Sequence, residues 1–383
     1  MQTPIVIIGS GFAAYQLIKT VRRMDAHIPI QVFTAEDGAE YNKPDLSHVF
    51  SRKQTASDLV VKSGDMFAKE HNIDLFANTK VEKVDIYTQQ VTANGQVYPY
   101  GKLVFATGAK AFVPPMNGDG VGDVLTLNSL QEYQAAETQI SRAKRVLIIG
   151  GGLIGVEIAM DLATCGKNVT VIEPNTRLLA NLIPEFIALP IERQLKQQGI
   201  QLGLETSVVA IDRSESGLTA TLRCGRTVET DIMISAAGLC ANTQLAKEAA
   251  IRVNKGIVVD SRLQTSTRNV FALGDCAEIQ DRMMPYLQPI VLGANVLAKQ
   301  LLGQDAQLVL PPMMVKVKTP SYPIQLAGTV NEVDHWEVNI SVSGVVAKAK
   351  DDNDHLVGFV VTNEQIEQAF PLLRELSQIS RQS

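Results

Sequence analysis

Short apolar runs and amphipathic segments alternate along the first part of the chain. Residues 5–8 form a continuous run of branched apolar side chains, and residues 28–33 form a second run. Runs of this kind are typical of strands that are buried on both faces of a parallel sheet. Between them, Leu17, Ile18 and Val21 recur at helical spacing. The pattern predicts a strand–helix–strand unit with a glycine-rich first turn.

The same unit recurs in the middle of the chain. Residues 145–149 form a second buried strand, followed by a predicted helix over 156–165 and a strand over 169–172. Two copies so far apart are an architectural repeat rather than a short-period solenoid. The repeat implies two nucleotide-binding domains in an α/β protein.

The remaining pattern predicts shorter elements. Residues 81–99 alternate in strand fashion around a turn at Asn94-Gly95. After Gly303 the hydrophobic pattern changes: it predicts short strands with alternating apolar residues and then a final helix, which we interpret as a small third domain. We expect these further elements at residues 103–106, 315–318, 336–342, 356–361 and 364–376.

A glycine motif follows the first strand. In Gly9-x-Gly11-x-x-Ala14, the first glycine permits a tight turn, the second lets the backbone approach a pyrophosphate, and Ala14 allows close packing of the helix. The N-terminus of the helix supplies N–H groups to phosphates. Glu36 is placed just past the second strand to accept hydrogen bonds from a ribose, with Asp37 as the weaker candidate.

The second copy carries the motif Gly150-x-Gly152-x-x-Gly155, and Glu173 ends its next strand. The Glu173 carboxylate would bond the adenosine ribose 2′-OH and repel the 2′-phosphate of NADPH. The nearest arginine is Arg177, which does not occupy the position of a phosphate ligand. The motif therefore favours NADH.

Two further strand ends carry glycine. Thr107-Gly108 follows the strand at 103–106, and Gly274-Asp275 follows another apolar strand that begins at Val270. Glycines at these points let a nucleotide cross the sheet edge closely. The Asp275 carboxylate is placed to hold flavin ribityl hydroxyls.

The motifs occur in the order found in the pyridine nucleotide–disulfide oxidoreductase superfamily. Residues 41–47, Tyr-Asn-Lys-Pro-Asp-Leu-Ser, are similar to a signature of rubredoxin and ferredoxin reductases. Down to Val317–Pro320, essentially all 383 residues resemble the reductases of flavorubredoxin. Those enzymes pass NADH electrons to the rubredoxin centre of a flavodiiron nitric oxide reductase. The resemblance implies two Rossmann-like domains, with the NAD domain inserted into the FAD domain, and a small α+β C-terminal domain.

The expected domain boundaries follow from two crossings, near Pro114-Pro115 and near residues 236–242. Residues 1–112 and 240–310 would form the FAD domain, residues 113–239 the NAD domain, and residues 311–383 the C-terminal interface domain.

The resemblance also implies roles for individual residues. Lys43 and Pro44 should lie beside the isoalloxazine, and Glu157 near the nicotinamide. Lys43 and Glu157 are then positioning residues, with no proton transfer assigned to them. The helix start at Gln288 should face the flavin pyrimidine, and Gly238 should belong to the NAD site.

The sequence departs from the family pattern at two points. His48 stands where ferredoxin reductases often carry lysine, and residues 238–241 lack the proline of the usual G-x-x-P. Both departures concern loop geometry rather than the reaction. His48 is interpreted either as part of the site or as an exposed surface residue.

Cysteine is absent from residues 36–64, where disulfide reductases of this superfamily carry a redox pair. The four cysteines are scattered, which favours a reducing, cytoplasmic setting and argues against a disulfide framework or a zinc site. We expect Cys276 to be structural. Flavin electrons must therefore pass directly to an outside acceptor.

Composition narrows the remaining function classes. Hydrophobic residues make up 45% of the chain and charged residues 20%, with a formal net charge of −5. Dispersed Lys and Arg argue against a nucleic-acid partner, and no apolar stretch is long enough to span a membrane. The first residues lack the features of a secretory signal. We expect no bound metal, and a monomer is slightly favoured.

The preferred hypothesis is an FAD-dependent NADH oxidoreductase that reduces flavorubredoxin. The alternative enzyme is a rubredoxin or ferredoxin reductase that serves another electron-transfer chain. A different class is an NAD(H)-binding redox sensor or interaction module. We further expect an acidic rubredoxin domain to dock on a patch of basic residues, namely Lys43, Arg52, Lys53, Lys62, Lys316 and Lys318.

Overall fold

The structure is a computed structural model, and it describes residues 3–319, 322–331, 333 and 335–379. The chain divides into two compact units. Unit 1 contains the residues up to Lys43, Ala56–Lys110 and Leu239–Leu310. Unit 2 contains Pro44–Thr55, Ala111–Gly238 and the residues from Pro311 onward. The division of the chain into three domains, expected from the sequence, stays a prediction.

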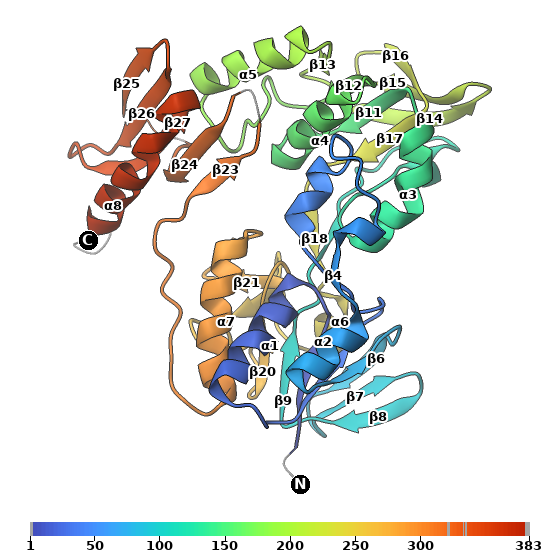
Figure 1. Ribbon diagram of the computed structural model, residues 1–383, viewed down its shortest axis with the longest axis vertical. Helices are drawn as coiled ribbons and strands as arrows, with labels where there is room; N and C mark the ends of the chain where they lie inside the picture. Colours follow the sequence, from blue (N-terminus) through green and yellow to red (C-terminus); the bar gives the residue numbers. More distant parts are fainter. Residues whose placement is uncertain (1–2, 320–321, 332, 334, 380–383) are drawn as a thin grey trace. The chain divides into compact units, whose positions relative to one another are not determined.

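Unit 1 is built on a five-stranded parallel sheet in the order β20-β9-β1-β2-β5. Side chains in the central strands, such as Val6, Val32 and Val104, are fully buried. Such strands are continuous apolar runs because both faces of a parallel sheet are covered. Helices α1 and α7 pack side by side on this unit (Figure 1). The elements named here are β1 Ile5–Ile8, α1 Phe12–Met24, β2 Ile30–Phe33, β5 Asp74–Phe76, β9 Lys102–Phe105, β20 Val270–Ala272 and α7 Leu287–Leu301.

Smaller elements complete unit 1. The alternating residues 81–99 form an antiparallel sheet, β6-β7-β8, in which Asn94 and Gly95 have φ of 49° and 71°. Positive φ at both turn residues gives a two-residue hairpin, so the predicted turn is confirmed. The chain leaves unit 1 within β10 and returns at β18. These elements are β3 Glu40–Tyr41, β4 Val60–Lys62, α2 Gly64–His71, β6 Val81–Asp85, β7 Gln90–Ala93, β8 Gln96–Pro99, β10 Ala109–Ala111, β18 Leu239–Ala241, α6 Gln244–Glu248, β19 Ile257–Val259, β21 Ala277–Ile279 and β22 Arg282–Met283.

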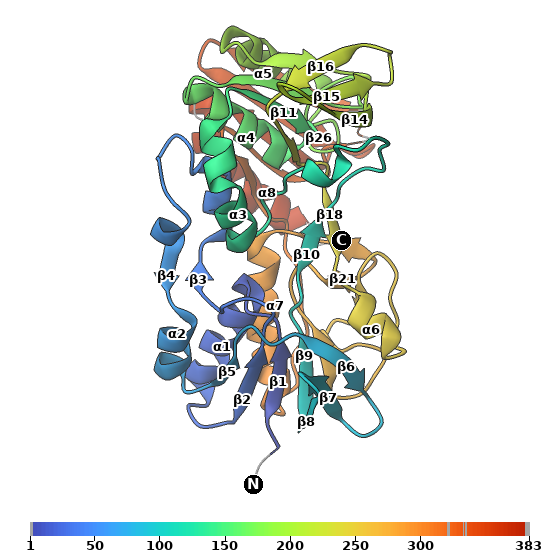
Figure 2. The same ribbon diagram turned by 90° about the vertical axis from the view of Figure 1, so that its right-hand side faces the viewer.

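Unit 2 contains a second parallel sheet, in the order β13-β12-β11-β17 (Figure 1). An antiparallel sheet, β14-β15-β16, lies beside β11 (Figure 2). The helix predicted over 156–165 begins earlier, at Leu153, because Gly152 is its N-cap. Gly155 therefore lies inside the first turn of the helix. The elements are α3 Leu130–Arg142, β11 Arg145–Ile149, α4 Leu153–Thr164, β12 Asn168–Ile172, α5 Glu185–Gln197, β13 Gln201–Gly203, β14 Val208–Ser214, β15 Gly217–Leu222, β16 Thr227–Thr230 and β17 Ile232–Ser235.

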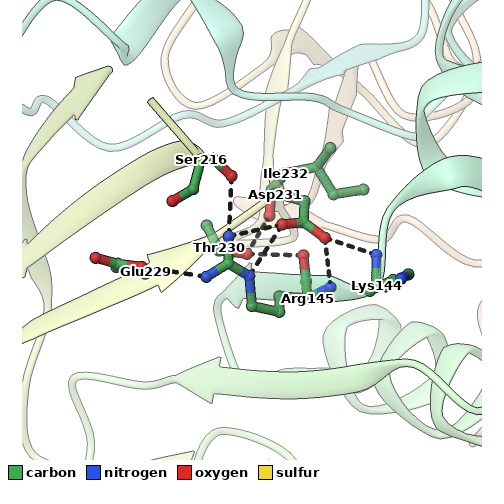
Figure 3. Close-up of polar contacts among 7 residues, drawn as sticks. All are labelled: Lys144, Arg145, Ser216, Glu229, Thr230, Asp231 and Ile232. Atoms are coloured by element: carbon green, nitrogen blue, oxygen red, sulfur yellow. Dashed lines mark hydrogen bonds and ion pairs between the residues drawn. The ribbon is translucent and has the colours of Figure 1, made fainter. Parts of the chain in front are cut away.

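A polar network fixes the start of β11 to the turn between β16 and β17 (Figure 3). Asp231 accepts hydrogen bonds from the backbone N–H groups of Lys144 and Arg145, at 2.7 and 2.9 Å, and pairs with the Arg145 guanidinium at 2.8 Å. The guanidinium also pairs with Glu229 at 3.2 Å. Partial burial opposes ionisation of Asp231, but the backbone N–H groups and the guanidinium outweigh it and lower the pKa of this carboxyl.

The C-terminal part of unit 2 is an antiparallel sheet in the order β23-β24-β27-β26-β25, with α8 packed on one face. The predicted helix over 364–376 is wrong at its start: a 3₁₀ helix spans Asn363–Gln368, and α8 begins at Ala369. Pro371 then lies in the first turn, where its missing N–H costs nothing. The elements are β23 Val315–Val317, β24 Ile324–Gly328, β25 His335–Ser341, β26 Gly344–Lys350, β27 Leu356–Thr362 and α8 Ala369–Ile379.

Candidate functional site

The first glycine motif forms the turn between β1 and α1. Gly9 has a φ of 114°, and a Cβ there would lie 2.2 Å from the carbonyl oxygen of Ala106, so only glycine fits. A Cβ on Gly11 would instead meet nothing within 4 Å. Neighbouring protein atoms do not require glycine at that position, and an approaching ligand would. Ala14 is fully buried in α1, as its packing role demands.

The carboxyl ends of β9 and β20 meet this turn. A Cβ on Gly274 would lie 2.7 Å from the Cβ of Ala13, so the turn at 274–276 lies against the start of α1. Asp275 Oδ2 lies 3.7 Å from Lys43 Nζ. The structure thus brings together Gly9, Gly274, Asp275 and Lys43 at one sheet edge, which is where open α/β sheets bind ligands.

Asn242, which follows β18, fixes the turn at Thr107-Gly108. Its backbone N–H donates to the Gly108 carbonyl at 3.0 Å, and its Nδ2 donates to the Thr107 carbonyl at 2.8 Å. The Thr107 hydroxyl donates to the Asn242 carbonyl at 2.9 Å. Asn242 is not among the site residues predicted from the sequence. Its position directly after the second crossing could have indicated this role, since Asn side chains commonly form hydrogen bonds with nearby backbone groups.

A small cavity of about 40 Å³ lies beside the first glycine motif. Ser10, Gly11, Tyr15 and Glu40 are among its lining residues. Burial raises the pKa of the Tyr15 hydroxyl, which donates to the Gly38 carbonyl. Glu36, the predicted ribose acceptor, is partly exposed and does not line this cavity.

The start of α7 carries the predicted flavin-facing residues. Tyr286 is its N-cap, and Gln288 is the second helical residue and is exposed. Pro289 occupies the first turn, where helices tolerate proline. The free N–H groups of this turn form a positive helix end available to an electron-rich group.

The second glycine motif repeats the geometry of the first. Gly150 has a φ of 109°, and a Cβ on Gly155 would lie 2.0 Å from the Gly150 carbonyl oxygen. A Cβ on Gly152 would again meet nothing within 4 Å. At the end of β17, the Gly238 carbonyl accepts a hydrogen bond from the Phe112 N–H at 2.9 Å. The open space at Gly152, like that at Gly11, is where a pyrophosphate would fit.

The Glu173 carboxylate is held against the second glycine turn. Its Oε2 accepts from the Gly151 N–H at 2.6 Å. Its Oε1 accepts from the backbone N–H and the Nδ2 of Asn175, at 2.9 and 2.6 Å. Only 7% of the residue is exposed. Arg177 donates instead to the Ala180 carbonyl at 3.2 Å.

Glu157, on α4, is 5% exposed and accepts two hydrogen bonds. The Ser47 hydroxyl donates to its Oε2 at 2.7 Å, and the Lys318 N–H donates to its Oε1 at 3.1 Å. His48 Nε2 lies 3.7 Å from Glu157 Oε2. The His48 side chain is only 13% exposed, so its interpretation as an exposed surface residue is wrong. Lys318 belongs to residues 317–320, which are part of the family resemblance seen in the sequence. Pro320 lies outside the described residues.

Several kinds of site are not found in the part of the chain that the structure describes. No cluster of three or more His, Cys, Asp or Glu residues there could hold a metal ion. None of the described helices is long and apolar enough to cross a membrane. The four cysteines are free, and Cys276 is fully buried. Its thiol lies 3.4 Å from the Phe105 carbonyl oxygen.

Two parallel sheets, each with a glycine turn whose second glycine faces open space and with further glycines near neighbouring strand ends, define a class of oxidoreductase with two nucleotide cofactors. The chain belongs to the pyridine nucleotide-disulphide oxidoreductase family, whose model matches residues 3–290. Residues 307–376 match a rubredoxin binding C-terminal domain. The fold class predicted from the sequence is confirmed. Membership of this family confirms the use of FAD and NADH.

Relatives match over nearly the whole chain. A nitric oxide reductase FlRd-NAD(+) reductase from Vibrio vulnificus (strain YJ016) is 66% identical over 378 residues, covering 99% of each chain. The protein of the same name from Aliivibrio fischeri is 56% identical and covers 98% of this chain and 99% of the relative. Among solved structures, the ferredoxin reductase of the CYP199A2 system from Rhodopseudomonas palustris has a TM-score of 0.89 at 23% identity, covering 98% of this chain and 96% of that one. The last likeness shows the fold alone.

Proposed function

We propose that the protein is an NADH:flavorubredoxin oxidoreductase that supplies electrons to a flavodiiron nitric oxide reductase and so serves nitric oxide detoxification. The observation that carries this proposal is the match of residues 307–376 to a rubredoxin binding domain, in a chain that also carries two glycine motifs for nucleotides. The names of the full-length relatives support it. FAD, held by the residues of the first glycine turn and by Asp275, would supply the chemistry that links the two-electron oxidation of NADH to one-electron reduction of the rubredoxin iron.

We assign the site residues to the two nucleotides as predicted from the sequence. Residues 1–112 and 240–310 would hold FAD, residues 113–239 NADH, and residues 311–383 would face the partner. The proposed FAD ligands are Gly9, Gly11, Ala14, Glu36, Lys43, Pro44, Thr107, Gly108, Gly274, Asp275 and Gln288. The proposed NAD ligands are Gly150, Gly152, Gly155, Glu157, Glu173 and Gly238.

Glu157 acts in this proposal as a positioning residue. Its carboxylate already accepts from Ser47 and from the backbone of Lys318, so its orientation is fixed before any nucleotide arrives. A preorganised group of this kind orients a ligand without reorganisation at the moment of reaction. Lys43 is held in the same way by Asp275. Neither residue needs to transfer a proton.

The absence of a thiol relay determines the kind of acceptor. Residues 36–64 contain no cysteine, and Cys276 is buried against the Phe105 carbonyl. The acceptor must then approach the flavin directly, as a small one-electron protein can. We propose a monomer that acts in the cytoplasm, with flavorubredoxin as partner and with neither nucleic acid nor membrane involved.

Anaerobic rapid mixing with NADH, followed by turnover with separate acceptors, tests this function. Flavin should be reduced by NADH alone, and steady NADH oxidation should require flavorubredoxin or its rubredoxin domain. A ferredoxin serves as the competing acceptor. Faster turnover with ferredoxin would indicate a reductase for another electron-transfer chain. Flavin reduction without turnover on any acceptor would indicate a redox sensor.

A further inference from the structure

Helix α4 carries two buried acids in an otherwise apolar sequence. Glu157 is 5% exposed and Asp161 is 6% exposed. Residues four apart lie on the same face of a helix. A buried carboxylate is costly unless hydrogen bonds compensate it, so both side chains need partners on that face.

The partners come from the segment Pro44–Thr55, which we call the strap. Asp161 Oδ2 accepts from the backbone N–H groups of Phe50 and Ser51, at 2.8 and 3.1 Å. Glu157 Oε2 accepts from the Ser47 hydroxyl at 2.7 Å. One face of α4 therefore holds the strap at two points, one helical turn apart.

Helix α3 holds the same strap further along. The Tyr133 hydroxyl donates to the Gln54 carbonyl at 2.6 Å, and its ring meets the Phe50 ring edge-on at 6.0 Å. The strap is thus fastened at its middle and its end by buried polar groups as well as by packing.

The strap lies between two segments of unit 1 in the chain, so its hydrogen bonds to α3 and α4 concern both units. The strap belongs to unit 2, although the residues directly before and after it, Lys43 and Ala56, belong to unit 1. Lys43 pairs with Asp275 at the glycine turns of unit 1. The same 3₁₀ helix, Lys43–His48, contains Lys43 and the first contact to α4. Lys43 is thus joined, within one continuous helix, to the residues that bind α4.

We propose that Asp161 is a positioning residue for the reduction of the flavin by NADH: by anchoring Phe50 and Ser51 to α4, it fixes the strap so that Pro44 and Lys43 keep their place beside the flavin. This inference rests on the proposed function. It concerns orientation alone, and Asp161 touches neither nucleotide in it.

The test compares Asp161→Asn and Asp161→Ala with Glu192→Gln. Glu192 is the matched control, because it is another buried carboxylate of unit 2, 6% exposed, that accepts a backbone N–H, from Leu178 at 3.0 Å. Each FAD-loaded protein is mixed anaerobically with NADH over a range of concentrations. The limiting rate constant of flavin reduction and the apparent Kd of NADH are then separated.

For Asp161→Ala we expect the limiting rate constant to fall by about tenfold, since small misplacements of positioning groups carry effects of this size or larger. The apparent Kd of NADH should change by less than about twofold, because the glycine turn is untouched. Asp161→Asn should lie between, since its one amide oxygen can accept both backbone N–H groups but carries no charge, and hydrogen bonds to a neutral acceptor are weaker. Hydrogen exchange at the amides of Phe50 and Ser51 should accelerate in both variants, and Glu192→Gln should match the wild type in every readout.

Two results would overturn the inference. One is an unchanged rate constant in Asp161→Ala and Asp161→Asn despite faster exchange at Phe50 and Ser51. The other is an equal loss in Glu192→Gln, which would mean that the effect reports general destabilisation. If Asp161→Ala does not fold, Asp161→Asn decides the question. Failure of the wild-type flavin to accept electrons from NADH would instead refute the proposed function.

Discussion

Replacing Glu173 with Gln should shift coenzyme preference from NADH toward NADPH. Glutamine keeps the size of the side chain but removes its charge. In the wild type, two carboxylate oxygens accept hydrogen bonds from Gly151 and from Asn175. The single amide oxygen of Gln can still accept the hydrogen bonds made by one of the two carboxylate oxygens, either from Gly151 or from Asn175. The glycine turn should therefore largely retain its shape.

The magnitude follows from two terms. A hydrogen bond from the ribose hydroxyl to a carboxylate is worth about 1 kcal/mol more than one to a neutral amide. Loss of the repulsion between a carboxylate and the 2′-phosphate of NADPH contributes on the order of another 1–3 kcal/mol at an effective dielectric of about 20. The sum of about 2 kcal/mol or more corresponds to a change of at least about thirtyfold in the ratio of kcat/KM values.

Initial rates with each coenzyme, at a fixed excess of a one-electron acceptor, give this ratio directly. Asn175→Ala is the control, because it removes the side-chain donor to Glu173, while the backbone N–H donor, the carboxylate and its charge remain. It should lower kcat/KM for both coenzymes and leave their ratio within about threefold of the wild type. Comparable kcat/KM values for NADH and NADPH in the wild type would refute the reasoning. So would an unchanged ratio in Glu173→Gln.

Four further outcomes are expected. The wild type should be yellow, and Asp275→Ala should lose FAD or bind it weakly, as the flavin absorbance after gel filtration will show; a colourless wild type that takes up no FAD would contradict the assignment of unit 1. Replacing all four cysteines with Ser or Ala should leave the rate of acceptor reduction largely intact, and a loss of more than about a hundredfold in a folded variant would reinstate a thiol mechanism. Asp231→Asn should lower the Tm at pH 7. Folding lowers the pKa of the Asp231 carboxyl, so the ionised group stabilises the fold fully above its unfolded pKa of about 3.9 and loses this effect as pH falls through the folded pKa. The Tm difference between Asp231→Asn and the wild type should therefore shrink below about pH 4. A difference that grows there would contradict this sign. Reversing Lys316 and Lys318 to Glu should raise the KM for flavorubredoxin and leave flavin reduction by NADH unchanged, and unchanged acceptor kinetics would place the docking surface elsewhere.

The nucleotide-binding strands and turns were predictable because their signals are local. A continuous apolar run ends at a glycine, and the glycine is required by backbone within the same sheet, as the contact between Gly9 and Ala106 shows. The predicted strand over 28–33 was too long at its start, since β2 begins at Ile30, just after Pro29. Boundaries of this kind depend on which backbone groups find a ladder partner, and proline offers no N–H.

The strap could not be placed from the sequence. Its partners on α4 lie 110 and 111 positions away along the chain. No periodicity of the strap itself indicates which surface it covers. Asp161 did carry a signal: a second acid, four residues after Glu157, interrupts an otherwise apolar helix. Such an acid needs a hydrogen-bond donor, although the sequence does not say which segment provides it.

The expected basic patch is smaller than the sequence suggests, and this changes where a partner would dock. Lys43 pairs with Asp275, Arg52 with Asp45, and Lys62 with Glu70.

Exposed charges that already face an acid contribute little net positive potential. Lys53, Lys316 and Lys318 are exposed and have no acidic partner among the described residues. All three belong to unit 2, and the backbone of Lys318 is fastened to Glu157. An acidic acceptor attracted to this part of the chain would meet the rubredoxin binding domain beside α4, the helix that carries Glu157. Charge reversal at Lys316 and Lys318 is therefore a sharper test than reversal at Lys43 or Lys62, whose removal would also break an ion pair within unit 1.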